Sequence, residues 1–153
     1  MRIKIFSENP KETQKIAALF INTILKQKDL KRRQALVISL EGNLGSGKTE
    51  FLKGIASGSK LKGHIFSPTF LIMKRFPLSY QSFKFLWHWD CYRLKSIKEL
   101  KELDFLTILN DPQNIVFIEW GNKIKHFLPK NHWTIKFQIL GEKKRSLTIT
   151  DNK

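Results

Sequence analysis

The sequence predicts an α/β fold, a single domain over residues 1–153 with a mixed parallel and antiparallel central sheet flanked by helices. Two continuous apolar runs, ALVISLE at 35–41 and NIVFIE at 114–119, are typical of strands buried on both faces of a parallel sheet. A glycine-rich turn and a helical pattern follow the first run. Two alternating segments, HWTIKFQIL and RSLTIT, flank the polar turn GEKK and predict a C-terminal antiparallel hairpin.

The chain begins with a strand pattern followed by a helix pattern. RIKIF alternates polar and apolar residues, which predicts a short strand. The helix start is signalled by Asn9 as N-cap, Pro10 at the first helical position and Glu12 in the first turn. Apolar or small residues at helical spacing predict one buried stripe, formed by Ile16, Leu19, Phe20, Thr23 and Ile24.

The middle of the chain predicts one more helix and two more strands before the second apolar run. FLIMKRF and SFKFLWHWD are separated by a loop around Pro77. The alternation of the second segment predicts a half-exposed antiparallel strand. Its two faces would carry Phe83, Phe85, Trp87 and Trp89 on one side and Leu86, His88 and Asp90 on the other. Ser96 and Glu99 form a capping box for the helix IKELKEL.

The cysteine count, the N-terminus and the length of the apolar runs bear on where in the cell the protein is found. Cys91 is the single cysteine, so no intramolecular disulfide can form, and a lone cysteine after a strand is typical of inert packing. The N-terminus lacks the apolar core of a signal peptide, and the apolar runs are far shorter than the ~20 residues of a membrane span. We therefore expect a cytoplasmic protein without membrane contact.

The formal net charge of +15 suggests an anionic partner such as nucleic acid. The basic residues are mostly lysines scattered along the chain, and such a pattern equally fits a compositional bias toward lysine. Both readings of the basic surface, a tRNA contact and a merely solvated surface, stay open.

The segment GNLGSGKT matches the phosphate-binding pattern G-x-x-x-x-G-K-[ST] between an apolar strand and a helix. Glycines bring backbone N–H groups against phosphate oxygens, and the following helix points its positive end at the same anion. Lys48 would reach the β and γ phosphates, and the Thr49 hydroxyl would join the shell of a Mg²⁺ ion. The sequence thus predicts a P-loop nucleoside triphosphatase whose nucleotide-contacting residues are Gly42, Asn43, Leu44, Gly45, Ser46, Gly47, Lys48, Thr49 and Glu50.

A P-loop site also needs an acid near the metal, usually at the end of a neighbouring strand. Glu119 ends NIVFIE, the better parallel neighbour of the P-loop strand, and is predicted as the metal-side acid. Asp90 ends FKFLWHWD and is predicted as a second acid facing the γ-phosphate or the attacking water. Lys48, Asp90 and Glu119 are therefore the candidate catalytic residues, and Thr49 and Glu119 the candidate metal ligands.

Two motifs that the sequence lacks indicate which nucleotide is bound and which group accepts the phosphoryl group. The nearest string to the guanine reader N-K-x-D is NKIK at 122–125, which lacks the aspartate, so ATP is the favoured nucleotide. A small-molecule kinase usually adds an arginine-bearing lid, whereas only Arg75 and Arg93 lie between the P-loop and the C-terminal hairpin. Water is then the favoured phosphoryl acceptor, and a small-molecule kinase remains the alternative.

Four strings together resemble the TsaE (YjeE) family closely: GNLGSGKTEF, SPTF at 67–70, HWDCYRL at 88–94 and IEW at 118–120. The resemblance covers nearly the whole chain. It implies an ATPase that binds ATP with Mg²⁺ and hydrolyses it slowly. It also implies association with TsaB and TsaD, of which TsaD transfers a threonylcarbamoyl group to the adenosine beside the anticodon of tRNAs that read codons beginning with A. A tRNA-binding module in which ATP acts only as a switch is a further alternative.

The resemblance also assigns roles by position. Lys48 and Thr49 lie in the phosphate loop, Glu119 holds Mg²⁺, and Asp90 resembles the functionally needed aspartate of the family. The remaining candidates implied by the family pattern are the switch residues Ser67 and Thr69, the aromatic Trp120, and the adenine-side residues Pro10 and Gly141. Arg93 is a separate candidate, either as a transition-state or partner contact or as a member of a surface ion pair. Glu50 departs from the family, where a second threonine is common, and the sequence alone does not explain it.

Overall fold

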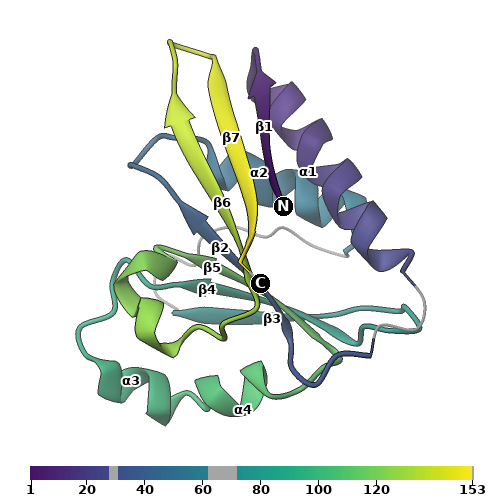
Figure 1. Cartoon of the computed structure of the whole chain (residues 1–153), viewed down its shortest axis with the longest axis vertical. Coiled ribbons are helices and arrows are strands. Elements are labelled where there is room, and N and C mark those ends of the chain that lie inside the picture. Colours follow the sequence, from purple (N-terminus) through teal and green to yellow (C-terminus); the bar gives the residue numbers. More distant parts are fainter. Residues whose placement is uncertain (28–30, 62–71, 153) are drawn as a thin grey trace.

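The structure, a computed structural model, describes residues 1–27, 31–61 and 72–152. Its strands are β1 (Arg2–Ser7), β2 (Leu36–Glu41), β3 (Met73–Pro77), β4 (Phe85–Asp90), β5 (Asn114–Glu119), β6 (His132–Ile139) and β7 (Arg145–Asn152). Its helices are α1 (Pro10–Leu25), α2 (Lys48–Gly58), α3 (Ile97–Glu102), α4 (Phe105–Leu109) and the 3-10 segment η1 (Gly121–Phe127). The strands form one sheet in the order β1-β7-β6-β2-β5-β4-β3 (Figure 1).

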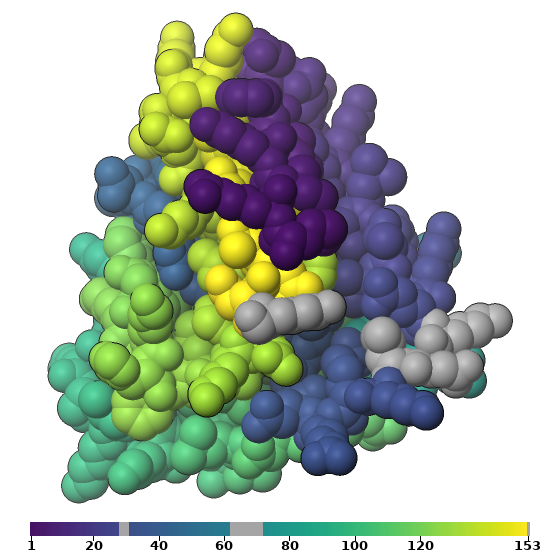
Figure 2. Space-filling view, viewed as in Figure 1, coloured from purple at the N-terminus to yellow at the C-terminus, as the bar shows by residue number. Residues whose placement is uncertain are grey.

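The sheet is parallel in its centre and antiparallel at both ends. β2 pairs in parallel with β5 and β6, and β5 pairs in parallel with β4. β3 closes one end, and the β6–β7 hairpin with β1 closes the other, all antiparallel. Figure 2 shows the first strand, in purple, packed directly beside the last strand, in yellow. The predicted α/β fold with a mixed sheet is confirmed.

Two hydrophobic cores lie on opposite faces of the sheet. One joins α1 and α2 to β2, β4, β5, β6 and β7, and the other joins α3, α4 and η1 to β2, β4 and β5 (Figure 1). Because successive strand residues point to opposite faces, Ile38 belongs to the first core and Val37 to the second. The predicted burial of β2 and β5 on both faces is therefore confirmed.

β4 is antiparallel to β3, as its alternation predicted, but it is not half-exposed. It pairs in parallel with β5, and Leu86, His88 and Trp89 are all fully buried. Leu86 packs in the first core and Trp89 in the second. The prediction was wrong because alternation of aromatic and polar residues was taken as a sign of solvent on one face, whereas both faces are covered.

The predicted stripe of α1 was also wrong in part. Leu19 is 70% exposed and Thr23 is exposed, whereas Ala17 and Ile21 are fully buried. The physical reason is the glycines of α2, since a Cβ on Gly54 would lie 2.7 Å from the Cβ of Ala17. The close approach of the two helices selects small residues of α1, which hydrophobic spacing alone does not reveal.

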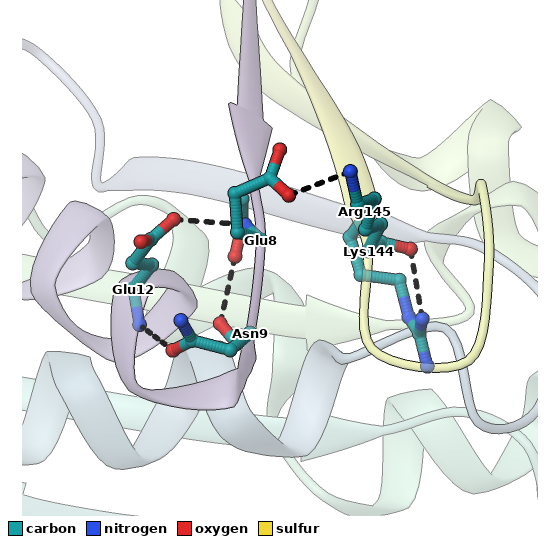
Figure 3. Close-up of polar contacts among 6 residues, drawn as sticks. Glu8, Asn9, Glu12, Lys144 and Arg145 are labelled. Carbon is teal, nitrogen blue, oxygen red and sulfur yellow. Dashed lines mark hydrogen bonds and ion pairs between the residues drawn. The ribbon is translucent and has the colours of Figure 1, made fainter.

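Local signals predicted the ends of several elements. The Asn9 side chain accepts a hydrogen bond from the Glu12 backbone N–H at 3.0 Å, as Figure 3 shows, and Ser96 with Glu99 forms the capping box of α3. The C-terminal hairpin forms as predicted, whereas α4 and η1 were not predicted. Within the described ranges, no helix combines the length and the apolar character that crossing a membrane requires.

Candidate functional site

The glycine-rich loop connects the end of β2 to the start of α2. Gly45 and Gly47 adopt φ values of 75° and 105°, a region that favours glycine because it has no Cβ. Gly42 is required for a different reason, since a Cβ there would lie 2.9 Å from the Phe137 carbonyl oxygen of β6. The loop thus has the backbone freedom that a phosphate cradle needs.

The Lys48 ammonium lies inside this loop. Its Nζ donates to the carbonyl oxygens of Gly42 at 2.7 Å and Asn43 at 3.1 Å, and it sits 4.5 Å from the ring centre of Trp120. Burial lowers the pKa of Lys48, while the nearby carboxylates of Glu119 and Asp90 act in the opposite direction. The loop therefore holds a buried ammonium group whose hydrogen-bond partners are neutral backbone carbonyls.

The two predicted acids lie side by side at the ends of adjacent strands. Asp90 of β4 and Glu119 of β5 are register partners, and Glu119 is also the register partner of Leu40 in β2. Glu119 is buried, and its Oε1 accepts a hydrogen bond from Nε2 of His88 at 2.8 Å. Since the carboxyl ends of parallel strands meet at one edge, the topology brings both acids to the phosphate loop.

A cavity of about 460 Å³ lies where the loop, the acids and the C-terminal hairpin meet. The predicted site residues that line it are Pro10, Leu44, Gly45, Ser46, Gly47, Lys48, Thr49, Glu50, Asp90, Arg93, Glu119 and Trp120. Gly42 and Asn43 line a neighbouring groove instead, and Gly141 is absent from the lining of either. Ser67 and Thr69 lie outside the described residues.

Some residues of the cavity wall were missed from the sequence: Thr13, Tyr92, Glu142, Lys143 and Arg145. Thr13 is one turn after the helix cap, and Tyr92 lies within HWDCYRL, so position relative to known motifs was the available signal for these two. The three hairpin residues carry no motif. They reach the cavity because β6 pairs with β2 as far as Glu41 and then continues to Ile139, past the end of β2, which is a consequence of tertiary structure.

Trp120 closes the cavity beside Glu119. It adopts a positive φ of 60°, which is uncommon for a bulky residue, and its N–H donates to the Leu40 carbonyl at 3.1 Å. Its ring packs against Tyr92 at 5.1 Å. Backbone strain of this kind clusters at functional sites and persists where surrounding contacts enforce it.

Glu50, which the sequence left unexplained, connects the two helices of the site. Its Oε2 accepts from Nε2 of Gln14 in α1 at 2.6 Å, and its Oε1 pairs with Lys53 at 2.6 Å. The hydrogen bond from Lys53 lowers the pKa of Glu50. The carboxylate therefore joins the first turn of α2 to α1 at the cavity wall.

The two arginines considered for phosphoryl transfer have different positions. Arg93 is exposed and lines the cavity. The Arg75 guanidinium of β3 lies over the Phe85 ring, 4.8 Å from its centre, and the residue is not part of the cavity lining.

The donor atoms present suit a magnesium ion that is shared with a nucleotide. Thr49 offers a hydroxyl, and Glu119 and Asp90 offer carboxylates, on the wall of one cavity. The described residues contain no cluster of three or more His, Cys, Asp or Glu side chains that would form a complete protein cage. Mg²⁺ usually takes one or two carboxylates and completes its shell with phosphate oxygens and water, so the residues fit this ion.

Comparisons with known proteins agree with this arrangement. The sequence profile of the family described as "Threonylcarbamoyl adenosine biosynthesis protein TsaE" matches residues 7–147. The tRNA threonylcarbamoyladenosine biosynthesis protein TsaE of Rickettsia felis is 36% identical over 147 residues, covering 94% of this chain and 77% of that protein. The protein of the same name from Bacillus subtilis is 33% identical over 149 residues, covering 97% and 85%.

A solved structure is similar over the whole chain. The crystal structure of Bacillus subtilis YdiB superposes with a TM-score of 0.73 at 27% identity, covering 100% of this chain and 87% of that one. The sequence and the fold thus point to the same family. The chain belongs to the TsaE family of threonylcarbamoyl adenosine biosynthesis proteins.

Proposed function

We propose that this protein binds ATP with Mg²⁺ and hydrolyses it slowly to ADP and phosphate. In this role it works with TsaB and TsaD in threonylcarbamoyl modification of the adenosine beside the anticodon, in tRNAs that read codons beginning with A. It is an accessory ATPase and not the transferase. The observation that carries the proposal is the meeting of Lys48, Thr49, Asp90 and Glu119 on the wall of one cavity.

Binding would begin at the phosphate loop. Its backbone N–H groups and the start of α2 attract the phosphates, and Lys48 would exchange its contacts with the Gly42 and Asn43 carbonyls for phosphate oxygens. A Mg²⁺ ion held by Thr49 and Glu119 would neutralise charge on the β and γ phosphates. Asp90 would orient the attacking water.

The rim of the cavity supports the assignment of partner proteins. Leu44 in the loop is 82% exposed, and Tyr92, which also lines the cavity, is 53% exposed. Tyrosine is enriched in protein interfaces, so Tyr92 offers a contact to a protein that covers this rim. A partner on this rim would exclude water from the site and contact the nucleotide-bearing loop directly.

Phosphate release from ATP tests the proposal. We expect purified protein to hydrolyse ATP only with Mg²⁺, and TsaB with TsaD to raise the turnover. Glu119→Gln should lower the rate by about a hundredfold, because it removes the metal-side charge. Lys98→Ala, on a lysine whose side chain is 83% exposed on α3, is the control and should change nothing. Normal hydrolysis by Glu119→Gln with Mg²⁺ would contradict the metal assignment.

A second candidate function, direct tRNA binding, is favoured by a basic groove of about 1060 Å³ next to the loop. Arg2, Lys4 and Lys136 line it, and all three are exposed. The acid on the groove wall, Glu41, lies 3.8 Å from Lys136. tRNA binding measured over a salt series tests this candidate: phosphate contacts require affinity to fall steeply with salt, and Lys4→Glu should weaken it.

A further inference from the structure

Arg145, the first residue of β7, reaches back to the phosphate loop from one hundred positions further along the chain. Its Nη2 donates to the Gly45 carbonyl oxygen at 3.1 Å. Its Nη1 donates to three carbonyl oxygens of the hairpin turn, those of Gly141 at 2.9 Å, Glu142 at 3.3 Å and Lys144 at 2.8 Å. One guanidinium therefore joins the hairpin turn to the tip of the loop.

The charge of this guanidinium is not balanced nearby. Among the described residues, no carboxylate oxygen lies within 4 Å of it, and its Nε is buried without a hydrogen-bond partner. The side chain also packs on the loop backbone, since a Cβ on Gly47 would lie 3.7 Å from the Arg145 Cγ. A positive group with an unused donor thus forms part of the cavity wall.

The contact with Gly45 also fixes the orientation of the loop. Because a peptide unit is planar and trans, holding the Gly45 carbonyl also sets the direction of the Ser46 N–H, which donates to the Asn43 carbonyl at 3.1 Å. Rotation of this peptide unit would break both hydrogen bonds, the one from Arg145 to the Gly45 carbonyl and the one from the Ser46 N–H to the Asn43 carbonyl. The contact with Arg145 therefore opposes a change in the shape of the loop.

We propose that Arg145 is a nucleotide-positioning residue, which holds the phosphate loop in its anion-binding orientation and places an uncompensated positive charge beside the phosphates. The inference rests on the proposed ATP-binding function and assigns a residue that no motif identifies. Arginine is needed because its planar fork reaches carbonyls in two chain segments at once, whereas the compact lysine ammonium cannot bridge both.

The test measures binding of a fluorescent ADP analogue with Mg²⁺ to Arg145→Lys, which keeps the charge, and Arg145→Gln, which removes it. We expect both variants to weaken binding by about tenfold or more, with the glutamine variant weaker than the lysine variant. The KM for ATP should rise while kcat at saturation stays within about threefold, because the lost interactions are equally present in ground and transition states.

Two control variants show whether a loss of nucleotide affinity is specific to the Arg145 guanidinium. Lys98→Ala removes an exposed cation of α3 that is not part of the cavity wall, and Lys144→Ala removes the 2.8 Å ion pair with Glu8 that holds the same hairpin (Figure 3). Each should change affinity by less than about twofold. The thermal unfolding midpoint of each nucleotide-free variant, compared with the wild type, reports whether the fold is intact.

The outcomes are distinct. Binding by Arg145→Lys within about twofold of wild type would overturn the inference, and so would a loss of affinity in Lys98→Ala or Lys144→Ala as large as that in the Arg145 variants. A wild-type protein that binds no adenine nucleotide would instead overturn the proposed function. Loss of affinity in both Arg145 variants at an unchanged unfolding midpoint supports the positioning role.

Discussion

The Nε2 atom of His88 lies 2.8 Å from Oε1 of Glu119, and both residues are buried. His88 belongs to β4 and Glu119 to β5, so the hydrogen bond crosses between adjacent parallel strands. A carboxylate only accepts, which makes the histidine the donor in this pair. Glu119 is thereby oriented from the protein interior before any ligand arrives, as partners behind metal-binding side chains commonly do.

Replacing His88 should therefore affect both the fold and the site. We expect His88→Ala to lower the free energy of unfolding by about 1–3 kcal/mol, because the buried Glu119 carboxylate loses its donor. Nucleotide binding should also require more Mg²⁺. Urea denaturation and a magnesium titration measure the two effects, and His126→Ala, at an exposed position of η1, is the matched control. A variant that matched this control in both measurements would show that the hydrogen bond has no such role.

Gly54 of α2 should not tolerate a side chain. A Gly→Ala change inside a helix ordinarily stabilises it, but a Cβ here would overlap the Gln14 carbonyl and lie 2.7 Å from the Ala17 Cβ. We expect Gly54→Ala to destabilise the protein by about 1–3 kcal/mol in urea denaturation. Gly141→Ala is the control, because its Cβ would meet nothing closer than 3.9 Å. Stabilisation by Gly54→Ala would refute the close helix packing.

The carboxylate of Glu50 should make stability depend on pH. The Lys53 hydrogen bond holds the pKa of Glu50 below its ordinary value. The stabilisation is then fully present above that value and is lost as the pH falls through the lower pKa of the folded state. Glu50→Gln should cost about 0.5 kcal/mol near neutral pH and less in acid. Unfolding measured at several pH values checks this, and a difference that grew in acid would reverse the assigned sign.

Cys91 should be unreactive in the folded protein. Its side chain is fully buried, and burial together with the charge of Asp90 raises the pKa of the thiol to about 12. Because the thiolate is the reactive form, a thiol reagent should modify native protein far more slowly than protein unfolded in denaturant. Rapid modification of the native protein, at a rate close to that of the unfolded chain, would show that β4 opens readily after Asp90.

The sequence predicted those parts of the fold that have local causes. The strand patterns of β2 and β5, the Asn9 cap and the capping box at Ser96 each depend on residues within a few positions of one another. The buried faces of α1 and β4 were predicted incorrectly because partners far along the chain determine them. Small residues of α1 meet glycines of α2, and β4 is covered by helices on both sides.

In the candidate site, too, the residues in local motifs were predicted, whereas contacts between distant parts of the chain were not. The phosphate loop, Asp90, Glu119 and Trp120 were found from motifs, and the topology brings them to one cavity. Arg145 carries no motif and reaches the loop only because the β6–β7 hairpin extends past the end of β2. His88 was noted for the face it shares with Asp90, but its bond to Glu119 depends on the register between β4 and β5.

We propose that ATP held at this loop drives the tRNA modification in which the family takes part. The most direct test reconstitutes modification of tRNA with TsaB, TsaD and the activated threonylcarbamoyl donor, and counts modified tRNAs per complex. The wild-type protein and the surface control Lys98→Ala should support repeated rounds with ATP and Mg²⁺, whereas Lys48→Ala should not exceed about one round. Repeated rounds with Lys48→Ala would contradict the account.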